Sequence, residues 1–263
     1  MKTIVITGST RGIGFGLAQN FWKRDCSVMI NGRTQQSVDE GLENLSGLAP
    51  SERLSGFPCD VRNYEQIEAL WETAKKHFGH IDIWINNAGL AHGPVEFWNQ
   101  TPEQINNVIN VNMTGTLYGT RVALLGLREQ GGGFLYNMEG LGSRGGQMVA
   151  GMALYGTTKA GLSYFDDAMM KECEGTPVKF GALLPGMVVT DMLVGQRMRS
   201  EEEWERTKRI FNILADRVET VTPWLVDQML ANDRNGVRIS WLTRSKVMMR
   251  FLMAPFSRRN VVD

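Results

Sequence analysis

The stretch TIVITGSTRGIG, residues 3–14, joins a short apolar run directly to three glycines and decides the fold. Residues 3–7 are all β-branched and predict a buried strand, and a helical pattern follows the last glycine. In such a turn Gly8 allows the chain to bend, Gly12 lets a pyrophosphate approach the backbone, and Gly14 lets the helix pack closely on the sheet. Because helix starts attract phosphates, a dinucleotide site is predicted here. It comprises Gly8, Ser9, Thr10, Arg11, Gly12, Ile13 and Gly14.

The rest of the chain alternates short apolar runs with longer helical patterns. Apolar strands separated by helices indicate a parallel sheet covered on both faces, and right-handed crossovers make such a fold doubly wound. We therefore expect an α/β protein in which residues 1–263 form a single domain, since no repeat or low-complexity linker interrupts them. The expected strands are residues 3–7, 28–30, 54–59, 81–85, 134–138 and 179–184; the expected helices are residues 14–24, 34–45, 64–78, 153–172 and a long helix that Thr101-Pro102 opens.

Composition excludes several functions. The chain has 263 residues and equal numbers of basic and acidic side chains, 28 of each. Since nucleic-acid binders usually have a basic surface, we expect no nucleic-acid partner. Cys26, Cys59 and Cys173 are widely spaced, which predicts no disulfide, no metal site and a cytoplasmic location. The apolar run at the N-terminus is too short for a signal peptide or a membrane span.

The residues after the second and third strands bear on which dinucleotide binds. Sites for NAD usually carry an acid after the second strand, but residues 31–34 here read Asn-Gly-Arg-Thr. Arg33 could pair with a 2′-phosphate, and Arg11 is a second candidate, so NADP(H) is expected unless these arginines are merely solvated surface charges. Asp60-Val61 resembles the acid that bonds the adenine amino group in such sites, although Asp60 could instead cap the next helix.

Tyr155 and Lys159 are the most informative pair for chemistry. Side chains at i and i+4 lie on one face of a helix, so both would project into the same cleft. A phenol is a weak acid or base at neutral pH, and a neighbouring ammonium that stabilises the phenolate would bring its pKa toward the working range. The pair therefore predicts general acid–base catalysis.

The motifs together resemble a short-chain dehydrogenase/reductase over nearly the whole chain. They are TGSTRGIG at 7–14, NNAG at 86–89, NVNMTG at 110–115, YGTTK at 155–159 and PGMVVT at 185–190. The resemblance implies a Rossmann fold, a nicotinamide cofactor, hydride transfer between a carbonyl and an alcohol, and a homodimer or homotetramer built on the Tyr155 helix.

The same resemblance implies residue roles. Tyr155 would protonate the carbonyl oxygen, and Lys159 would hold the nicotinamide ribose and lower the pKa of Tyr155. Asn112 would support a proton-relay water, unless it only makes a hydrogen bond inside its helix. Thr190 would contact the nicotinamide, unless it caps a helix. The remaining cofactor contacts implied are Asn87, Ala88, Gly89, Pro185, Gly186 and Val188.

One position departs from the family pattern, which ends the fifth strand in a Ser-Ser pair. The usual serine aligns with Gly140 on the strand, or with Gly142 when counted from the tyrosine. Ser143 is the hydroxyl nearby and is predicted to orient the substrate carbonyl, with a loop serine that touches no substrate as the alternative. Glu139 could be a substrate ligand or a salt-bridge partner.

This departure resembles the chlorophyll(ide) b reductase branch, as do IDIWINNAG at 81–89 and LPGMVVTDML at 184–193. The branch implies reduction of the 7-formyl group of a chlorophyll b-type pigment, with another bulky apolar aldehyde or ketone as the alternative. Residues 187–216 are expected to form a substrate lid. Its apolar wall would comprise Met192, Leu193, Met198, Trp204, Phe211 and Leu214, unless these side chains are ordinary core.

Residues 246–259 are apolar with basic flanks. We expect them to pack on the sheet or on a partner subunit, while contact with a membrane surface or a pigment tail stays open. Two other functions also stay open: an alcohol dehydrogenase or ketoreductase with another substrate, and a non-catalytic sensor of NADP(H).

Overall fold

The computed structural model describes residues 1–46, 52–145, 148–194, 201–257 and 259–262. A seven-stranded sheet has the order β3-β2-β1-β4-β5-β6-β9, and every neighbouring pair is parallel. The α/β doubly wound fold expected from the sequence is confirmed. The strands are β1 (Thr3–Ile6), β2 (Ser27–Gly32), β3 (Leu54–Pro58), β4 (Ile83–Asn86), β5 (Gly133–Met138), β6 (Val178–Leu184) and β9 (Val237–Ser240).

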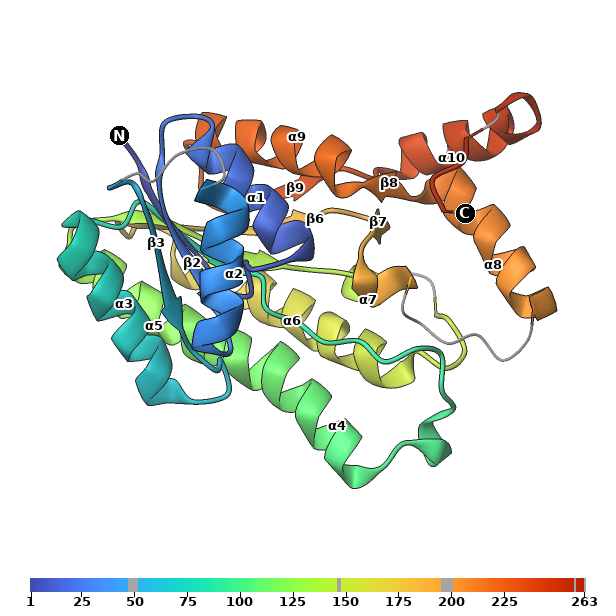
Figure 1. The fold of residues 1–263 in the computed structure, drawn as a ribbon, viewed down its shortest axis with the longest axis horizontal. Helices are drawn as coiled ribbons and strands as arrows, with labels where there is room; N and C mark the ends of the chain where they lie inside the picture. The colour runs from blue at the N-terminus through green and yellow to red at the C-terminus, as the bar shows by residue number, and fades with distance from the viewer. Residues whose placement is uncertain (47–51, 146–147, 195–200, 258, 263) are drawn as a thin grey trace.

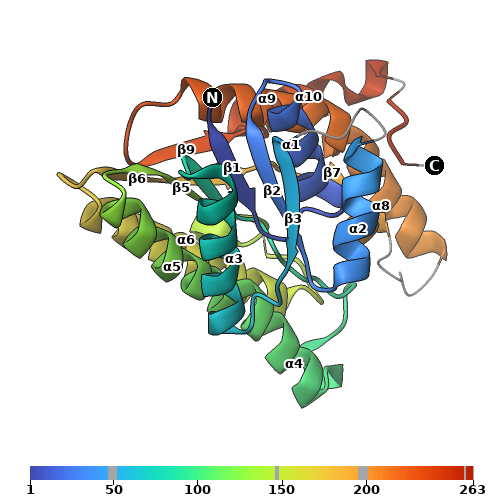
Figure 2. The ribbon, with the colours of Figure 1, turned by 60° about the vertical axis from the view of Figure 1, so that its left-hand side comes forward.

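Helices cover both faces of the sheet (Figures 1 and 2). One face carries α1 (Gly12–Trp22), α2 (Gln35–Ser46) and α9 (Val218–Ala231), and the other carries α3 (Tyr64–Phe78), α5 (Gly115–Glu129) and α6 (Ala153–Glu172). Side chains alternate between the two cores, because successive strand residues point to opposite faces. In β1, Ile4 and Ile6 join the core beneath α1 and α9, whereas Val5 joins the core beneath α3 and α5.

The remaining elements frame the carboxyl edge of the sheet. They are α4 (Pro102–Ile109), α7 (Asp191–Val194), α8 (Glu201–Leu214), α10 (Arg244–Met253), the paired short strands β7 (Val188–Val189) and β8 (Asp216–Arg217), a π-helical turn (Asn110–Thr114) and 3-10 turns at Phe97–Asn99, Ser143–Gly145 and Ala254–Phe256. The helix expected from Thr101-Pro102 begins there, where Thr101 and Gln104 form a reciprocal capping box. It continues into α5 through the π-helical turn.

The structure differs from the sequence-based expectations at the C-terminal end. The strand β9 and the β7–β8 pair were not expected, because each is short and carries a charged residue. The described part of residues 246–259 does not pack on the seven-stranded sheet: α10 has no buried residue and lies beside the end of α8 and the short strand β8 (Figure 1).

The described residues contain neither a membrane-spanning helix nor a cluster of metal-ligating side chains. None of the helices in these ranges is long and apolar enough to cross a membrane. No group of three or more His, Cys, Asp or Glu side chains in the same ranges could hold a metal ion.

Candidate active site

The glycine turn after β1 has the shape that a pyrophosphate requires. Gly8 and Gly12 both adopt positive φ, at 60° and 59°, which a side chain would disfavour. A Cβ atom on Gly14 would lie 2.5 Å from the Asn87 amide nitrogen, so only glycine lets α1 approach this closely. The first turn of α1 contains no acid and makes no side-chain cap, which leaves its amides and the exposed Arg11 beside them to bind an anion.

Two side chains predicted to contact the cofactor instead shape this turn. Ser9 is buried; its hydroxyl donates to the Ile6 carbonyl at 2.7 Å and accepts from the Asn31 amide at 2.9 Å. The Asn87 amide donates to the Thr7 and Gly8 carbonyls, both at 2.9 Å. These bonds lock the loops after β1, β2 and β4 against one another.

The loops after β2 and β3 bring Arg33 and Asp60 to the same edge. Arg33 is exposed, and Asp60 is held by a two-pronged contact with Arg62 at 2.5–3.0 Å. Hydrogen bonds from Arg62 lower the pKa of the Asp60 carboxyl, and the charge of Arg33 contributes to the shift. Asp60 does not cap α3, because the side chain of Asn63 does so.

The other predicted cofactor residues gather around the same loops. Thr190 lies 3.5 Å from the position of a Cβ atom on Gly12, so the segment after β6 closes over the glycine turn. Gly186 adopts a positive φ of 75° in that segment. Ala88 contacts Gly8, and Gly89 lies near Asn112. Thr10 contacts Gly32 and Gly41, and Val61 packs on Gly115. Ile13 packs on the core, Val188 is buried in β7, and Pro185 follows β6.

Tyr155 and Lys159 project from the first turns of α6 toward the end of β5. The Lys159 ammonium donates to the Met138 carbonyl at 2.7 Å and lies 5.8 Å from the centre of the Tyr155 ring. Burial raises the pKa of Tyr155 to about 12 and lowers the pKa of Lys159 to about 8. The expected depression of the Tyr155 pKa is therefore not met in this structure, since burial of the phenol raises it.

Gly140, and not Ser143, faces the phenol. A Cβ atom on Gly140 would lie 2.6 Å from the Tyr155 hydroxyl. The Ser143 hydroxyl donates its one proton to the Lys159 carbonyl at 3.2 Å and accepts from the Gly140 amide at 3.2 Å. The predicted contact of Ser143 with a substrate carbonyl is thus not available here, because the hydroxyl ties the loop to α6.

Asn112 lies in the π-helical turn and is fully buried. Its side-chain amide donates to the Leu90 carbonyl at 2.8 Å and to Thr158 at 3.1 Å, and its oxygen accepts from the Leu90 amide at 2.7 Å. The side chain therefore fixes the segment after β4 against α6, at Leu90, the residue that directly follows the NNAG motif.

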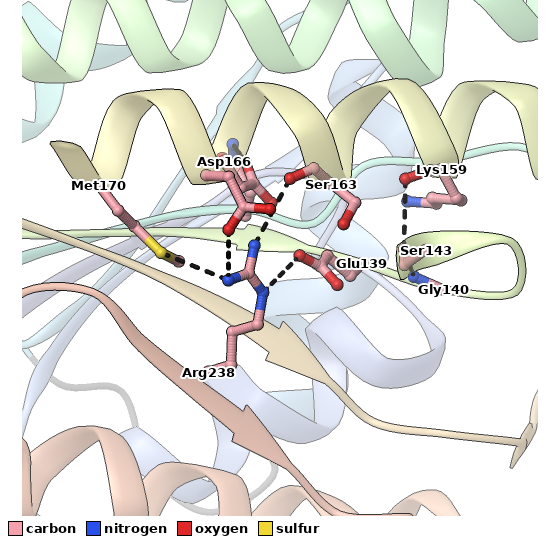
Figure 3. Close-up of polar contacts among 10 residues, drawn as sticks. Glu139, Gly140, Ser143, Lys159, Ser163, Asp166, Met170 and Arg238 are labelled. Carbon is pink, nitrogen blue, oxygen red and sulfur yellow. Dashed lines mark hydrogen bonds and ion pairs between the residues drawn. The ribbon is translucent and has the colours of Figure 1, made fainter. Parts of the chain in front are cut away.

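A buried cluster of charges lies behind Lys159 (Figure 3). Glu139 is fully buried and pairs with Arg238 of β9 at 3.1 Å, so the structure selects the salt-bridge alternative. Arg238 also pairs with the more exposed Asp167 at 2.8 Å. Asp166 accepts from Asn137 at 2.7 Å, and burial raises the pKa of its carboxyl to about 7. Glu139 and Asp166 both counteract the lowering of the Lys159 pKa.

Sequence reasoning missed two polar side chains near Tyr155. His92 and Gln100 line a small cavity of about 10 Å³ beside Tyr155, together with Val108, Gly151, Met152 and Leu154. The His92 Nε2 and Gln100 Oε1 atoms are buried without a hydrogen-bond partner. A cavity of this volume holds about one water, which would satisfy both atoms. The sequence feature that could have indicated these two side chains is their position after the NNAG motif: His92 follows it by three residues and Gln100 by eleven.

The predicted apolar wall is only partly present. Trp204 and Phe211 of α8 pack edge to face at 6.3 Å between ring centres and form a small core with Ala215 and Val262, while Met192 is exposed. Leu214 is half-buried at the end of α8. The side chains of Leu193 and Met198 lie outside the described residues.

A parallel sheet, a glycine turn at the first helix and a Tyr/Lys pair at the fifth strand together define a dinucleotide-binding α/β oxidoreductase class. The short chain dehydrogenase family model matches residues 2–201, and the chain belongs to this family. Among curated proteins, a probable chlorophyll(ide) b reductase NYC1 of Oryza sativa subsp. japonica is 34% identical over 96% of this chain and 52% of the relative. Chlorophyll(ide) b reductase NOL of the same plant is 33% identical over 98% of this chain and 76% of the relative. The chain spans about half the length of the NYC1 relatives.

Among solved structures, an actinorhodin polyketide ketoreductase with NADPH has a TM-score of 0.79 and 25% identity, over 91% of this chain and 95% of that chain. The comparisons correct one prediction. The expected cytoplasmic location is contradicted, because the matching chlorophyll(ide) b reductases are named as chloroplastic. The cysteine pattern could not reveal this, because three buried free cysteines do not distinguish one compartment from another.

Proposed function

We propose that the protein is an NADPH-dependent reductase that converts a carbonyl on a bulky apolar substrate to an alcohol. The observation that carries this proposal is the Tyr155 hydroxyl beside Gly140, with the Lys159 ammonium behind it, at the edge of the sheet that also bears the glycine turn. Burial raises the pKa of Tyr155 to about 12, so the phenol is protonated at neutral pH and holds the proton that reduction of a carbonyl requires.

The chain's own residues would bind and orient the reactants. The amides at the start of α1 and Arg11 hold the pyrophosphate, and Lys159 donates to the nicotinamide ribose. A bound dihydronicotinamide supplies the hydride. Tyr155 donates the proton to the carbonyl oxygen. Ser143 and Asn112 position the loop and α6 through hydrogen bonds.

Arg33 supports NADPH over NADH. The residue is exposed at the end of β2, no acid occupies that turn, and solved structures of this fold contain NADH, NADPH or NADP⁺. Replacing Arg33 with alanine should raise KM for NADPH about tenfold and leave KM for NADH unchanged, because an arginine–phosphate contact is lost. An equal rise for both cofactors, or a wild-type preference for NADH, contradicts the assignment.

The substrate proposed is an aldehyde on a large apolar framework, and the 7-formyl group of a chlorophyll b-type pigment is the particular case that the relatives suggest. The test is an NADPH-oxidation screen over ketones, simple aldehydes and formyl pigments. Tyr155→Phe should lose turnover by about three orders of magnitude while NADPH fluorescence still reports binding. Turnover of ketones alone would favour a ketoreductase, and no turnover of any carbonyl would favour a sensor.

A further inference from the structure

The C-terminal helix exposes its apolar side chains. Six large ones in α10 and the turn after it face solvent, and Leu252 and Phe256 are 69% and 83% exposed. A helix that packs on its own protein normally buries one apolar stripe, whereas α10 buries no residue. We name these six residues the C-terminal apolar face: Met248, Met249, Phe251, Leu252, Met253 and Phe256.

Buried ion pairs fix this orientation. Arg250 donates to the Leu214 carbonyl and to Asp216, both at 2.7 Å, and Arg259 donates to the other Asp216 oxygen at 2.7 Å. Asp216 also accepts from the Trp241 indole at 2.7 Å, and its side chain is only 8% exposed. Arg250 therefore points into the protein and the six apolar side chains point away, whereas an ordinary surface helix turns its apolar side inward.

The sequence at this end of the chain carries only basic charge, part of which Asp216 neutralises in the fold. From residue 234 to residue 262 the chain contains no acid, while the basic residues are Arg234, Arg238, Arg244, Lys246, Arg250, Arg258 and Arg259. Since the whole chain is neutral, the remainder is net negative. The Lys246 ammonium lies over the Trp241 ring, 3.1 Å from its centre; burial lowers its pKa, the charges of Arg250 and Arg259 lower it further, and Asp216 opposes them. Arg244 is exposed beside the face.

We propose that the C-terminal apolar face binds the surface of a phospholipid bilayer that contains anionic lipid. Apolar side chains would enter the boundary of the acyl chains, while Arg244 and Lys246 meet the phosphates. With ten residues, α10 is too short to span a bilayer and would lie in its interface. A second copy of the chain is the poorer occupant, because a twofold contact would bring two cationic faces together.

The experiment is co-sedimentation of the full chain with phosphatidylcholine vesicles, with and without an equal part of phosphatidylglycerol. Binding to the anionic vesicles should be about tenfold tighter and should weaken with salt, because each basic residue at an anionic surface adds several-fold. Leu252→Asp and Phe256→Asp should abolish binding, and Arg244→Glu should reduce the preference for phosphatidylglycerol. Tyr164→Asp, an equally exposed apolar position on α6, is the matched control and should bind as wild type.

Circular dichroism of each variant checks that the fold is retained. The proposal is overturned if wild type fails to bind the anionic vesicles, or if Leu252→Asp binds them as well as wild type does. It is also overturned if the wild-type chain self-associates without vesicles and Leu252→Asp abolishes that association, since the face would then be a contact between copies.

Discussion

Asp166 and Asp167 are neighbours on α6, but only Asp166 is buried behind Lys159. Burial lowers the pKa of Lys159 to about 8, and the charge of Asp166 limits that fall. The ammonium is lost as pH rises through this pKa, so removing a compensating anion moves the loss to lower pH. Asp166→Asn should shift the alkaline limb of the kcat/KM profile down by about one pH unit. Asp167→Asn should leave it in place, and equal shifts in both variants would contradict this account.

Gly140 is expected to be indispensable for the position of the Tyr155 hydroxyl. A methyl group at this position would come within 2.6 Å of that oxygen, so the phenol must move. Gly140→Ala should lower kcat about a hundredfold while NADPH still binds, because small displacements of an acid are costly. The control is Gly156→Ala, where nothing lies within 4 Å of an added Cβ atom. Full activity of Gly140→Ala would show that the phenol shifts without loss and that Gly140 does not set the position of the Tyr155 hydroxyl.

Local residues were predictable and distant partners were not. The glycine turn and the Tyr155–Lys159 pair can be recognised from the spacing of residues that lie close together in the sequence. Glu139 binds Arg238, 99 positions away, and the sequence therefore left its role open. The direction of the Ser143 hydroxyl depends on the curvature of the loop after β5, which no spacing rule reports.

The hydrogen bonds that Asp216 accepts from Trp241, Arg250 and Arg259, here called the Asp216 clamp, decide where α10 lies. Hydrogen bonds from Trp241, Arg250 and Arg259 outweigh burial and lower the pKa of Asp216, so the clamp is charged at neutral pH and fails only in acid. Asp216→Asn should destabilise α10 locally by about 3 kcal/mol, because two arginines lose a buried partner. Hydrogen exchange of α10 should then accelerate by about two orders of magnitude.

The control for this clamp is Asp227→Asn, which breaks the exposed pair with Arg24 and should cost less than about 1 kcal/mol. Unchanged exchange in α10 of the Asp216 variant would mean that the helix is held by other contacts.

Apolar continuity explains which elements could be predicted. Five of the six expected strands are mostly buried, as a parallel sheet requires, and the edge strand β3 is half-buried. The seventh, β9, is four residues long and includes Arg238, so its pattern is too weak to recognise. The orientation of α10 was also unpredictable, because Arg250 occupies the inward side where an apolar residue is normally expected.

For the whole molecule, the equal numbers of acids and bases conceal two distinct surfaces. The cationic end around α10 is one, and the outer layer of α5 and α6 is the other. That layer covers one face of the sheet (Figure 2). It exposes Leu117, Leu125 and Tyr164, the last by 80%. Exposed apolar side chains on neighbouring helices indicate a protein interface.

We therefore expect copies of the chain to associate through α5 and α6, as the family resemblance implies for the Tyr155 helix. Tyr164→Asp together with Leu125→Asp should reduce the mass measured by light scattering to that of one chain, because two buried charges would face one another. Leu252→Asp, on the C-terminal apolar face, should leave the mass unchanged. Tyr164→Asp and Leu252→Asp thus each serve as the control in one assay and as the test variant in the other. A double variant at Leu125 and Tyr164 that keeps the wild-type mass would rule out the layer of α5 and α6 as the interface.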